Sequence, residues 1–406
     1  MPKTRTRTSP SPGEVFSRLL DPAHRADPYP IHEQLRRTAV ADIGDGFWAV
    51  SGHEEIAYLL RHPGVSKEER KSRVAAGGIR ELASRFFLFL DPPEHDRLRR
   101  LTMDQFTPAR VTRMRGRVVT LVEEVLDAQR GRDDLDVVAD FAYPLPVTVI
   151  CELLGIPRAD ERRFHVWADV VAHGLDPDSD PELQDRLRGA ARELRDYVSA
   201  LVGERRARPE DDLISGLAAG TGPADTMADV DLVSTMVLML IAGHETTVNL
   251  ITNGVLTLLR HPDELDLLRA DPGRSVPVVE ELLRFEPPVQ FGTRFALTDL
   301  EVGGATIPAG AGIRLVFAAG NRDPRHVVEP DRFDPDRGGI EHLGFGGGIH
   351  YCVGAPLARL EAQIALAAFA RKVRSPRLLA DPPPYRSNAV LRGPEHLLVG
   401  FDDIVP

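Results

Sequence analysis

Apolar residues recur at spacings of three and four along most of the chain, and this period is typical of helices with one buried face. Residues 232–253 are apolar nearly all round, which indicates a long helix that is buried on every side. The periodicity predicts helices over residues 30–37, 53–61, 94–104, 108–130, 159–171, 181–207, 228–259, 262–270, 274–285 and 355–372.

Strand signals are fewer than helix signals. A glycine-rich turn at residues 44–46 lies between two short apolar runs, which predicts a hairpin. Residues 320–344 are rich in Pro, Asp and Arg without periodicity, so we expect an ordered meander there. The fold class expected is therefore mainly α with a small β region. The predicted strands cover residues 40–42, 47–50, 295–307 and 313–317.

Composition supports one large globular unit. The chain has 406 residues, 42% of them hydrophobic, and its 33 prolines and 34 glycines are spread along it rather than gathered in a linker. We expect a disordered tail over residues 1–12 and a single domain over 13–406. The net charge of −11 argues against a general nucleic-acid binder. Two cysteines exclude a disulfide framework and indicate a reducing compartment.

No membrane-targeting signal stands out. The first dozen residues lack the apolar stretch of a signal peptide or an anchor. The most apolar window, residues 232–243, is about half as long as the roughly 20 residues that span a bilayer. We therefore expect a cytoplasmic protein without membrane contact.

A cysteine stands among glycines near the C-terminus, where residues 345–354 read FGGGIHYCVG. Glycines let backbone N–H groups approach a sulfur closely, and Pro356 marks a helix start just after the loop. The helix dipole then favours the thiolate form of Cys352. The loop therefore predicts a thiolate ligand, most simply for a haem iron.

Other interpretations of this loop fit less of it. A buried structural cysteine explains only the sulfur, and a phosphate-binding loop needs a strand and lysine context that is missing here. A structural zinc site needs four ligands. The other cysteine, Cys151, stands alone in an apolar run, where a core role fits.

The long apolar helix is interrupted in its middle by the string Ala-Gly-His-Glu-Thr-Thr, residues 242–247. Thr246 follows Ala242 by four residues, so its hydroxyl can bond to that carbonyl and open the helix locally. Small side chains at Ala242 and Gly243 allow a flat cofactor to approach. The alternative is a helix break with a solvated Glu245.

Residues 345–354 match the pattern F-G-x-G-x-H-x-C-x-G at every fixed position, and this loop resembles the haem-binding loop of the cytochrome P450 family. The string at 242–247 resembles the oxygen-activating helix of the same family. The resemblance implies the cytochrome P450 fold, a triangular helical domain. It also implies haem b, buried between the central long helix and the cysteine-loop helix, with Cys352 as the axial ligand.

The resemblance assigns further residues. It implies that Glu245 and Thr246 deliver protons to dioxygen, and that Glu281 and Arg284 form a structural core with Arg332, or alternatively with Arg337. Basic residues at matching positions would hold the two haem propionates, although a lone arginine is more often solvated. The expected cofactor contacts are His95, Arg99, Ala242, Gly243, Arg294, Phe345, His350, Cys352 and Gly354. The expected substrate pocket comprises Phe87, Leu238, Met239, Ala242, Val289, Phe291 and Gly292.

The function implied is a haem-thiolate monooxygenase that inserts one oxygen atom into a lipophilic small molecule of secondary metabolism, by hydroxylation or epoxidation. The chain has no flavin or iron–sulfur pattern, so electrons are expected from a ferredoxin with its ferredoxin reductase. Arginines between residues 97 and 117 form a candidate docking patch, or an ordinary solvated helix surface. An oxidative coupling or peroxide-driven enzyme and a non-catalytic haem-binding protein are the alternatives.

Overall fold

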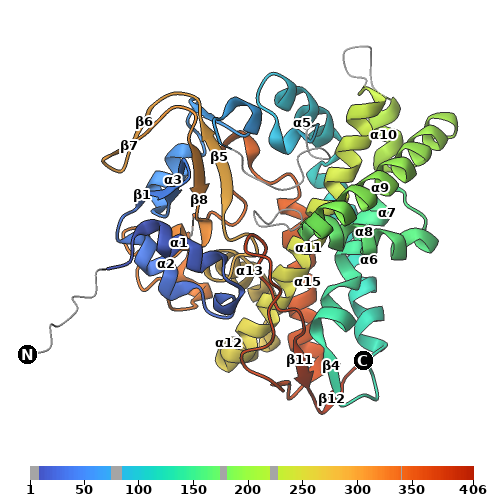
Figure 1. The fold of residues 1–406 in the computed structure, drawn as a ribbon. Coiled ribbons are helices and arrows are strands. Elements are labelled where there is room, and N and C mark those ends of the chain that lie inside the picture. Colours follow the sequence, from blue (N-terminus) through green and yellow to red (C-terminus); the bar gives the residue numbers. More distant parts are fainter. Residues whose placement is uncertain (1–8, 75–84, 174–180, 220–226, 340) are drawn as a thin grey trace, which may run out of the picture.

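The computed structural model describes residues 9–74, 85–173, 181–219, 227–339 and 341–406. Helices make up most of this part of the chain, and the strands gather mainly at one side (Figure 1). The helices are α1 (Pro12–Leu20), α2 (Tyr29–Arg36), α3 (His53–Leu59), α5 (Glu94–Gln105), α6 (Pro108–Asp127), α7 (Pro144–Leu154), α8 (Glu161–His173), α9 (Pro181–Ala207), α10 (Leu213–Ala219), α11 (Asp229–Arg260), α12 (Pro262–Ala270), α13 (Ser275–Phe285), α14 (Phe317–Gly320) and α15 (Ala355–Lys372).

Helix α11 runs through the middle of the helical region, as its apolar sequence predicts (Figure 1). It packs against α7, α8 and α9 on one side and against α13 and α15 on another. Helix α15 follows the cysteine loop and also packs against α6, α12 and α13. The two helices therefore bring the two sequence motifs into one core.

In the described part of the chain, the strands form a five-stranded sheet and three smaller sheets. In the large sheet the order is β1-β2-β8-β5-β3, so strands from residues 40–66 pair with strands from residues 292–315. The mainly α fold with a small β region is thus confirmed. The strands are β1 (Val40–Gly44), β2 (Phe47–Val50), β3 (Val65–Ser66), β4 (Asp134–Asp136), β5 (Gly292–Ala296), β6 (Leu300–Val302), β7 (Ala305–Ile307), β8 (Gly312–Leu315), β9 (Val373–Arg374), β10 (Arg377–Leu378), β11 (Leu398–Gly400) and β12 (Asp403–Ile404).

The hairpin of β1 and β2 forms where the glycine-rich turn predicts it. Gly44, Asp45 and Gly46 have φ angles of 92°, 52° and 75°, in the left-handed region that glycine tolerates and aspartate adopts more readily than most residues. The second predicted strand group divides into β5 to β8. Its last strand ends at Leu315, because the chain turns into α14 at Phe317.

The periodicity missed four helices of the described chain, α1, α7, α10 and α14. Helices α10 and α14 have only seven and four residues, so they are too short to show a helical period. Helix α1 is short and begins at Pro12, where Ser11 and Glu14 form a capping box; residues 1–8 of the expected tail lie outside the described residues. Helix α7 is buried on nearly all sides, so it shows little amphipathic period. Together with the π-helix before it, it forms the stretch Val137–Leu154, which is long and apolar enough to cross a membrane by length and composition alone, and 67% of it is buried inside the fold.

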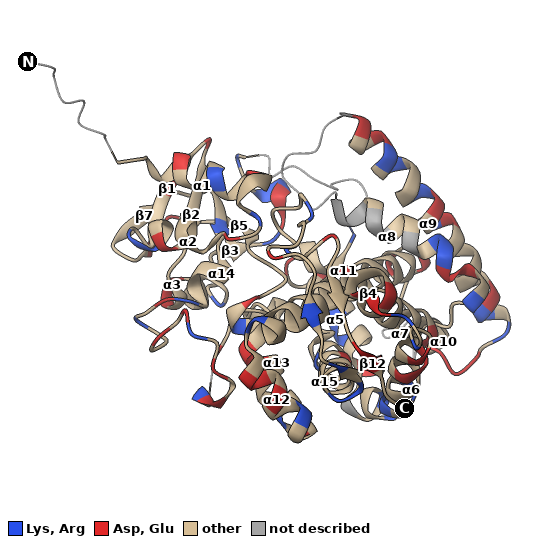
Figure 2. Ribbon diagram, turned by 90° about the horizontal axis from the view of Figure 1, so that it is seen from below, with Lys and Arg blue, Asp and Glu red and all other residues tan. Residues whose placement is uncertain are grey.

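Charged residues of both signs alternate along the outer helices. Figure 2 shows this for α9, whose outer surface carries both basic and acidic residues along its length. Helix α9 is therefore solvated on one side and apolar on the other. The buried side is formed by Leu187, Leu194, Val198 and Leu201.

Helix α13 carries a buried ion pair that also binds the meander after α14. The Glu281 carboxylate accepts from Arg284 Nη2 at 2.7 Å, and both side chains are fully buried. The third member is Arg337, whose Nε lies 3.2 Å from Glu281. The prediction of Arg332 for this place was wrong, because its side chain is 61% exposed and pairs with Glu329 and Asp334. Only the Arg332 carbonyl joins the network, accepting from Arg284 and Arg337.

Candidate functional site

A cavity of about 960 Å³ lies between α11, the cysteine loop, the start of α15 and strands β5 and β8. Its walls are mostly apolar, and Lys67, Arg99 and Arg294 gather around His350 at what we call its basic end. The cofactor contacts expected from sequence that line it are Arg99, Ala242, Gly243, Arg294, Phe345, His350, Cys352 and Gly354. The substrate-pocket residues expected from sequence, Phe87, Leu238, Met239, Ala242, Val289, Phe291 and Gly292, all line it as well.

The cysteine loop is held in shape by close backbone packing. Gly348 has a φ of 63°, and a Cβ there would lie 2.1 Å from the Leu60 carbonyl oxygen, so no other residue fits this position without rearrangement. The Cys352 N–H donates to the Phe345 carbonyl at 3.1 Å, which closes the loop. Cys352 is thereby fixed at the cavity wall, two residues before the cap of α15.

The surroundings of Cys352 act on the pKa of its thiol in opposite directions. Burial raises the pKa of its thiol, whereas the N–H groups of Gly354 and Ala355 and the charges of Arg99 and Arg359 lower it. The sequence predicts this contribution from the helix start, since the two N–H groups belong to Gly354, the N-cap of α15, and to Ala355, its first residue. A positive partner on the cavity side would favour the thiolate further.

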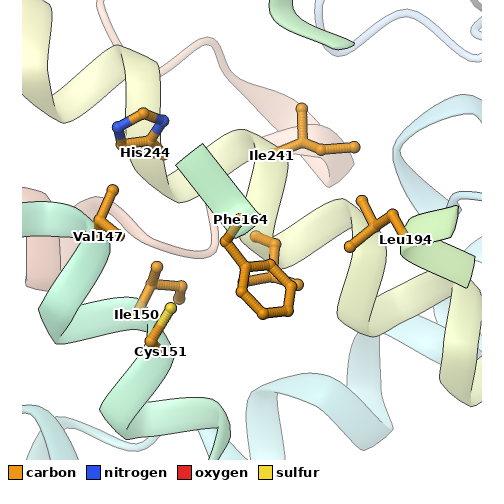
Figure 3. A pocket seen from close by; sticks show the side chains of 8 residues that line it. Val147, Ile150, Cys151, Phe164, Leu194, Ile241 and His244 are labelled. Carbon is orange, nitrogen blue, oxygen red and sulfur yellow. The ribbon is translucent and has the colours of Figure 1, made fainter. Parts of the chain in front are cut away.

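Cys151 occupies a different environment. It is fully buried in α7 and lines a small apolar cavity of about 10 Å³ with Phe164, Leu194 and Ile241 (Figure 3). Burial raises the pKa of its thiol to about 12. Its place agrees with the core role predicted for it.

Thr246 bonds to Ala242 as the spacing predicts. Its Oγ1 donates to the Ala242 carbonyl at 2.8 Å, and both residues line the cavity. The expected local opening of the helix was wrong, because α11 is continuous from Asp229 to Arg260. A threonine hydroxyl can share the carbonyl of the preceding turn while the backbone ladder stays intact.

Glu245 lies off the cavity wall, unlike its neighbour Thr246. It is buried, forms an ion pair with Arg386, and accepts from Asn249 Nδ2 at 3.5 Å. Among the described residues that line the large cavity, Thr246 and Thr247 are present and Glu245 is not. The structure therefore does not bring Glu245 into the cavity, and Arg386 is a partner that no sequence signal identified.

His95 and His350 meet near the basic end of the cavity. Their ring centroids lie 4.4 Å apart, and within the described residues His95 Nε2 and His350 Nδ1 are buried without a hydrogen-bond partner. His95 is the expected cofactor contact that does not line the cavity itself. Burial and the nearby Arg294, Lys67, His95 and Arg99 lower the pKa of His350 to about 2, so its ring is neutral.

Two arginines complete this end. Arg294, on β5, is buried with one hydrogen bond, to the Thr293 carbonyl at 2.9 Å, and burial lowers its pKa to about 10. Arg99, on α5, donates to the Tyr351 carbonyl at 2.7 Å, and burial lowers its pKa. A buried cation such as Arg294 needs an anionic partner, and the half-buried Arg99 can bind the same group.

Two further residues on the wall were missed by the sequence reasoning. Lys67 follows β3 and belongs to no motif. Glu361, on α15, is buried without a hydrogen-bond partner in the described part of the chain, and burial raises its pKa to about 8. An acidic residue between the apolar Leu360 and Ala362 was the signal available for it.

These residues fit a flat cofactor with an iron ligand at one side and two acid groups at one edge. The cysteine sulfur and the small Ala242 and Gly243 line one cavity, and the unpartnered His95 and His350 nitrogens and the buried Arg294 mark the place of the acid groups. The fold and site thus define a haem-thiolate protein.

Comparison with known proteins gives the same class. The family profile described as Cytochrome P450 matches residues 276–399. The chain is 38% identical to the cytochrome P450 monooxygenase PikC of Streptomyces venezuelae over 97% of this chain and 95% of that one. It is 37% identical to the 6-deoxyerythronolide B hydroxylase of Saccharopolyspora erythraea, over 95% and 98% of the two chains.

The structure agrees with the sequence relatives. Ligand-free CYP164A2 of Mycobacterium smegmatis superposes with a TM-score of 0.89 at 43% identity, covering 96% of this chain and 100% of that one. The chain belongs to the cytochrome P450 family, and it is a cytochrome P450 monooxygenase. The family implies a haem held by a cysteine thiolate, and the residues around Cys352 fit it.

Proposed function

We propose that this protein inserts one oxygen atom into a lipophilic small molecule of secondary metabolism, by hydroxylation or epoxidation, with haem b as cofactor. The observation that carries the proposal is that Cys352 and Thr246, from separate elements, line one largely apolar cavity. Haem b bound there supplies dioxygen activation, with Cys352 as its thiolate ligand.

The residues of the cavity perform defined tasks. Thr246 holds a proton at Oγ1, which it shares with the Ala242 carbonyl and can donate instead to an oxygen atom in the cavity. Arg99, Arg294, His95 and His350 bind the acid groups of the cofactor and so fix its rotation.

Glu245 acts from a distance in this proposal. Because it is paired with Arg386 off the cavity wall, any proton it supplies reaches Thr246 through water rather than by direct contact. Thr246 is therefore the group that touches the reacting oxygen.

The substrate is held by apolar contacts. Phe87, Leu238, Met239, Val289 and Phe291 lie on the cavity wall, and they exclude water from the part of the cavity that the substrate would fill. Burial of apolar surface favours a lipophilic molecule, at about 25 cal/mol for each Å² removed from water.

Electrons are proposed to come from a ferredoxin and its reductase in the cytoplasm. The exposed Arg113 and Arg115 on α6, which packs against α15, support docking of an acidic partner near the cysteine loop. Oxidative coupling remains a second candidate reaction, since it shares the early steps that need Thr246.

Two cysteine variants test the cofactor assignment. Cys352→Ala should abolish the red-shifted absorption of the reduced carbonyl complex that a thiolate ligand gives, because it removes the ligand. Cys151→Ala should keep that band, since Cys151 lies in the core away from the large cavity. A band that survives in Cys352→Ala and disappears in Cys151→Ala would refute the assignment.

Turnover tests the reaction class. A compound that shifts the haem spectrum on binding should be oxygenated when NADPH, a surrogate ferredoxin and its reductase are supplied, with one atom of labelled dioxygen in the product. A product that contains a new carbon–carbon or carbon–heteroatom bond and no label would indicate coupling instead. A protein that binds such compounds without consuming NADPH would be a non-catalytic haem-binding protein.

A further inference from the structure

Lys67 is a basic residue of the cavity wall that lies beside Arg294. Strand β3 pairs antiparallel with β5, with Val65 opposite Ala296 and Ser66 opposite Phe295. The next position in this register sets Lys67 opposite Arg294, so both side chains belong to the same face of the sheet. Both residues line the cavity.

The surroundings of Lys67 are positive. Burial and the charges of Arg294 and Arg314 lower its pKa. Its charge also acts on His350, together with those of Arg294 and Arg99. Its ammonium lies 5.1 Å from the centroid of the Phe89 ring, and within the described residues it makes no hydrogen bond or ion pair.

The nearest acids are already used. The Asp91 carboxylate accepts from Ser66 Oγ at 2.5 Å and from Lys71 Nζ at 2.6 Å. From Lys67 it accepts the backbone N–H, at 3.0 Å, and not the side-chain ammonium. Glu68 pairs with Arg70 and Lys71. The ammonium of Lys67 therefore has no acid of its own among the described residues.

Such an arrangement is costly without an anion. Like charges opposite each other on neighbouring strands destabilise a sheet, and a charge removed from water without a partner costs more than a surface ion pair gains. A carboxylate in the cavity would pair with Lys67 and Arg294 together. The contact with Phe89 alone does not require the charge, because a methionine would fill the same space.

We propose that Lys67 binds a carboxylate inside the cavity, as the third basic residue of an anion site that it forms with Arg99 and Arg294. The carboxylate comes either from an acid side chain of the haem or from an acidic group on the substrate. The proposal rests on the function proposed above, because both sources depend on a haem-loaded cavity.

The experiment uses haem-loaded protein and three variants. Lys67→Met removes the charge and keeps the length of the side chain, and Lys67→Arg keeps the charge. Lys71→Met is the matched control, because Lys71 lies on the same segment, pairs with Asp91 and does not line the cavity. If Lys67→Met does not fold, as judged by circular dichroism, Lys67→Gln replaces it.

One measurement follows the haem, and the other follows an acidic ligand. Transfer of haem to excess apomyoglobin should be about tenfold faster in Lys67→Met than in the parent if Lys67 binds a haem carboxylate. The spectral dissociation constants of dodecanoate and dodecanol are then compared. Loss of about tenfold in the preference for dodecanoate would identify a substrate carboxylate as the partner.

Faster haem transfer or a lost preference for dodecanoate in Lys67→Met supports the proposal if Lys71→Met and Lys67→Arg both behave like the parent. Which of the two changes occurs identifies the source of the carboxylate. Parent-like behaviour of Lys67→Met in both measurements overturns it, and so does a loss in Lys67→Arg equal to that in Lys67→Met. A parent protein that binds no haem would instead refute the proposed function, so the two failures are distinguishable.

Discussion

Glu245 and Thr246 are neighbours in sequence with opposite surroundings. The Thr246 hydroxyl lies at the cavity wall, and its one acceptor among the described residues is the Ala242 carbonyl. The Glu245 carboxylate is held by Arg386 and Asn249, off that wall. One residue step on a helix turns the side chain by about 100°, so adjacent polar residues serve different surfaces. This difference makes Thr246 the residue to change first.

Thr246→Ala should leave substrate binding nearly intact and divert electrons from product into hydrogen peroxide, because it removes the proton donor nearest the reacting oxygen. The loss of coupled product should be on the order of 10²-fold or more. Product formed per NADPH and hydrogen peroxide formed per NADPH measure it.

Ser234→Ala is the matched control, since Ser234 Oγ donates to the Val230 carbonyl at 2.7 Å on the exposed surface of the same helix. Unchanged coupling in Thr246→Ala would contradict the role of Thr246.

Glu361 is a buried acid whose protonation is set by burial. Its pKa is raised to about 8, from an ordinary value of 4.5. Between these two values the folded protein keeps the proton that the unfolded chain has lost, so the folded state binds more protons. The contribution of Glu361 to stability therefore falls as the pH rises from 4.5 to about 8, and it is constant above that.

Glu361→Gln should become more stable relative to the parent as the pH rises through this window, because the amide has no proton to lose. The relative free energy of unfolding should change by at most about 1.4 kcal/mol for each pH unit. Denaturant unfolding of both proteins at pH 5, 6.5 and 8 checks it. A difference that is the same at all three pH values would show that Glu361 does not titrate in this way.

At the scale of elements, α13 is tied to the meander by a buried network. Glu281 accepts from Arg284 within the helix, from Arg337 in the meander and from the Asp334 N–H at 2.9 Å. Arg284 in turn donates to the carbonyls of Pro330 and Arg332. One helix thereby holds the segment that leads into the cysteine loop.

Arg337→Ala should destabilise the protein by about 1–3 kcal/mol, because it leaves buried Glu281 and nearby carbonyls with fewer donors. Arg332→Ala should cost only about 0–1 kcal/mol, since its ion pairs are exposed. The free energies of unfolding in urea measure both. Equal losses for the two variants would contradict the assignment of Arg337 to the network.

At the scale of the molecule, the arginines between residues 97 and 117 are not a uniform patch. Arg97 pairs with Asp231 at 2.8 Å, and Arg117 binds Glu152 at 2.7 Å. Arg113 and Arg115 are exposed on α6. In a protein with a net charge of −11, these two are the better candidates for steering an acidic ferredoxin.

Reversing Arg113 and Arg115 to Glu should slow reduction by ferredoxin and weaken its dependence on salt, because steering acts on association over roughly the Debye length. Substrate affinity should not change. Stopped-flow reduction at several ionic strengths measures the effect.

The control changes Arg188 and Arg192 on α9 to Glu. This alters the net charge by the same amount, but on a helix that packs against α8 and α10 and lies outside the proposed docking site on α6. Equal reduction rates for the Arg113 and Arg115 variant and the parent at low ionic strength would refute this docking site.

The sequence alone determined the features that are built from residues close together along the chain. The cysteine loop is contiguous, and the bond from Thr246 to Ala242 spans one helical turn, so both could be predicted. The long apolar helix was equally evident, because apolar residues on all sides of a helix need burial.

Only the tertiary structure decided which distant side chains meet. Arg386 with Glu245, Arg337 with Glu281, and Lys67 beside Arg294 join segments that are far apart in sequence. A charged residue carries no mark of its partner, since a pair forms wherever packing brings opposite charges together. The pairing of β3 with β5 and the packing of α13 on the meander fixed those choices, and with them the chemistry of the cavity.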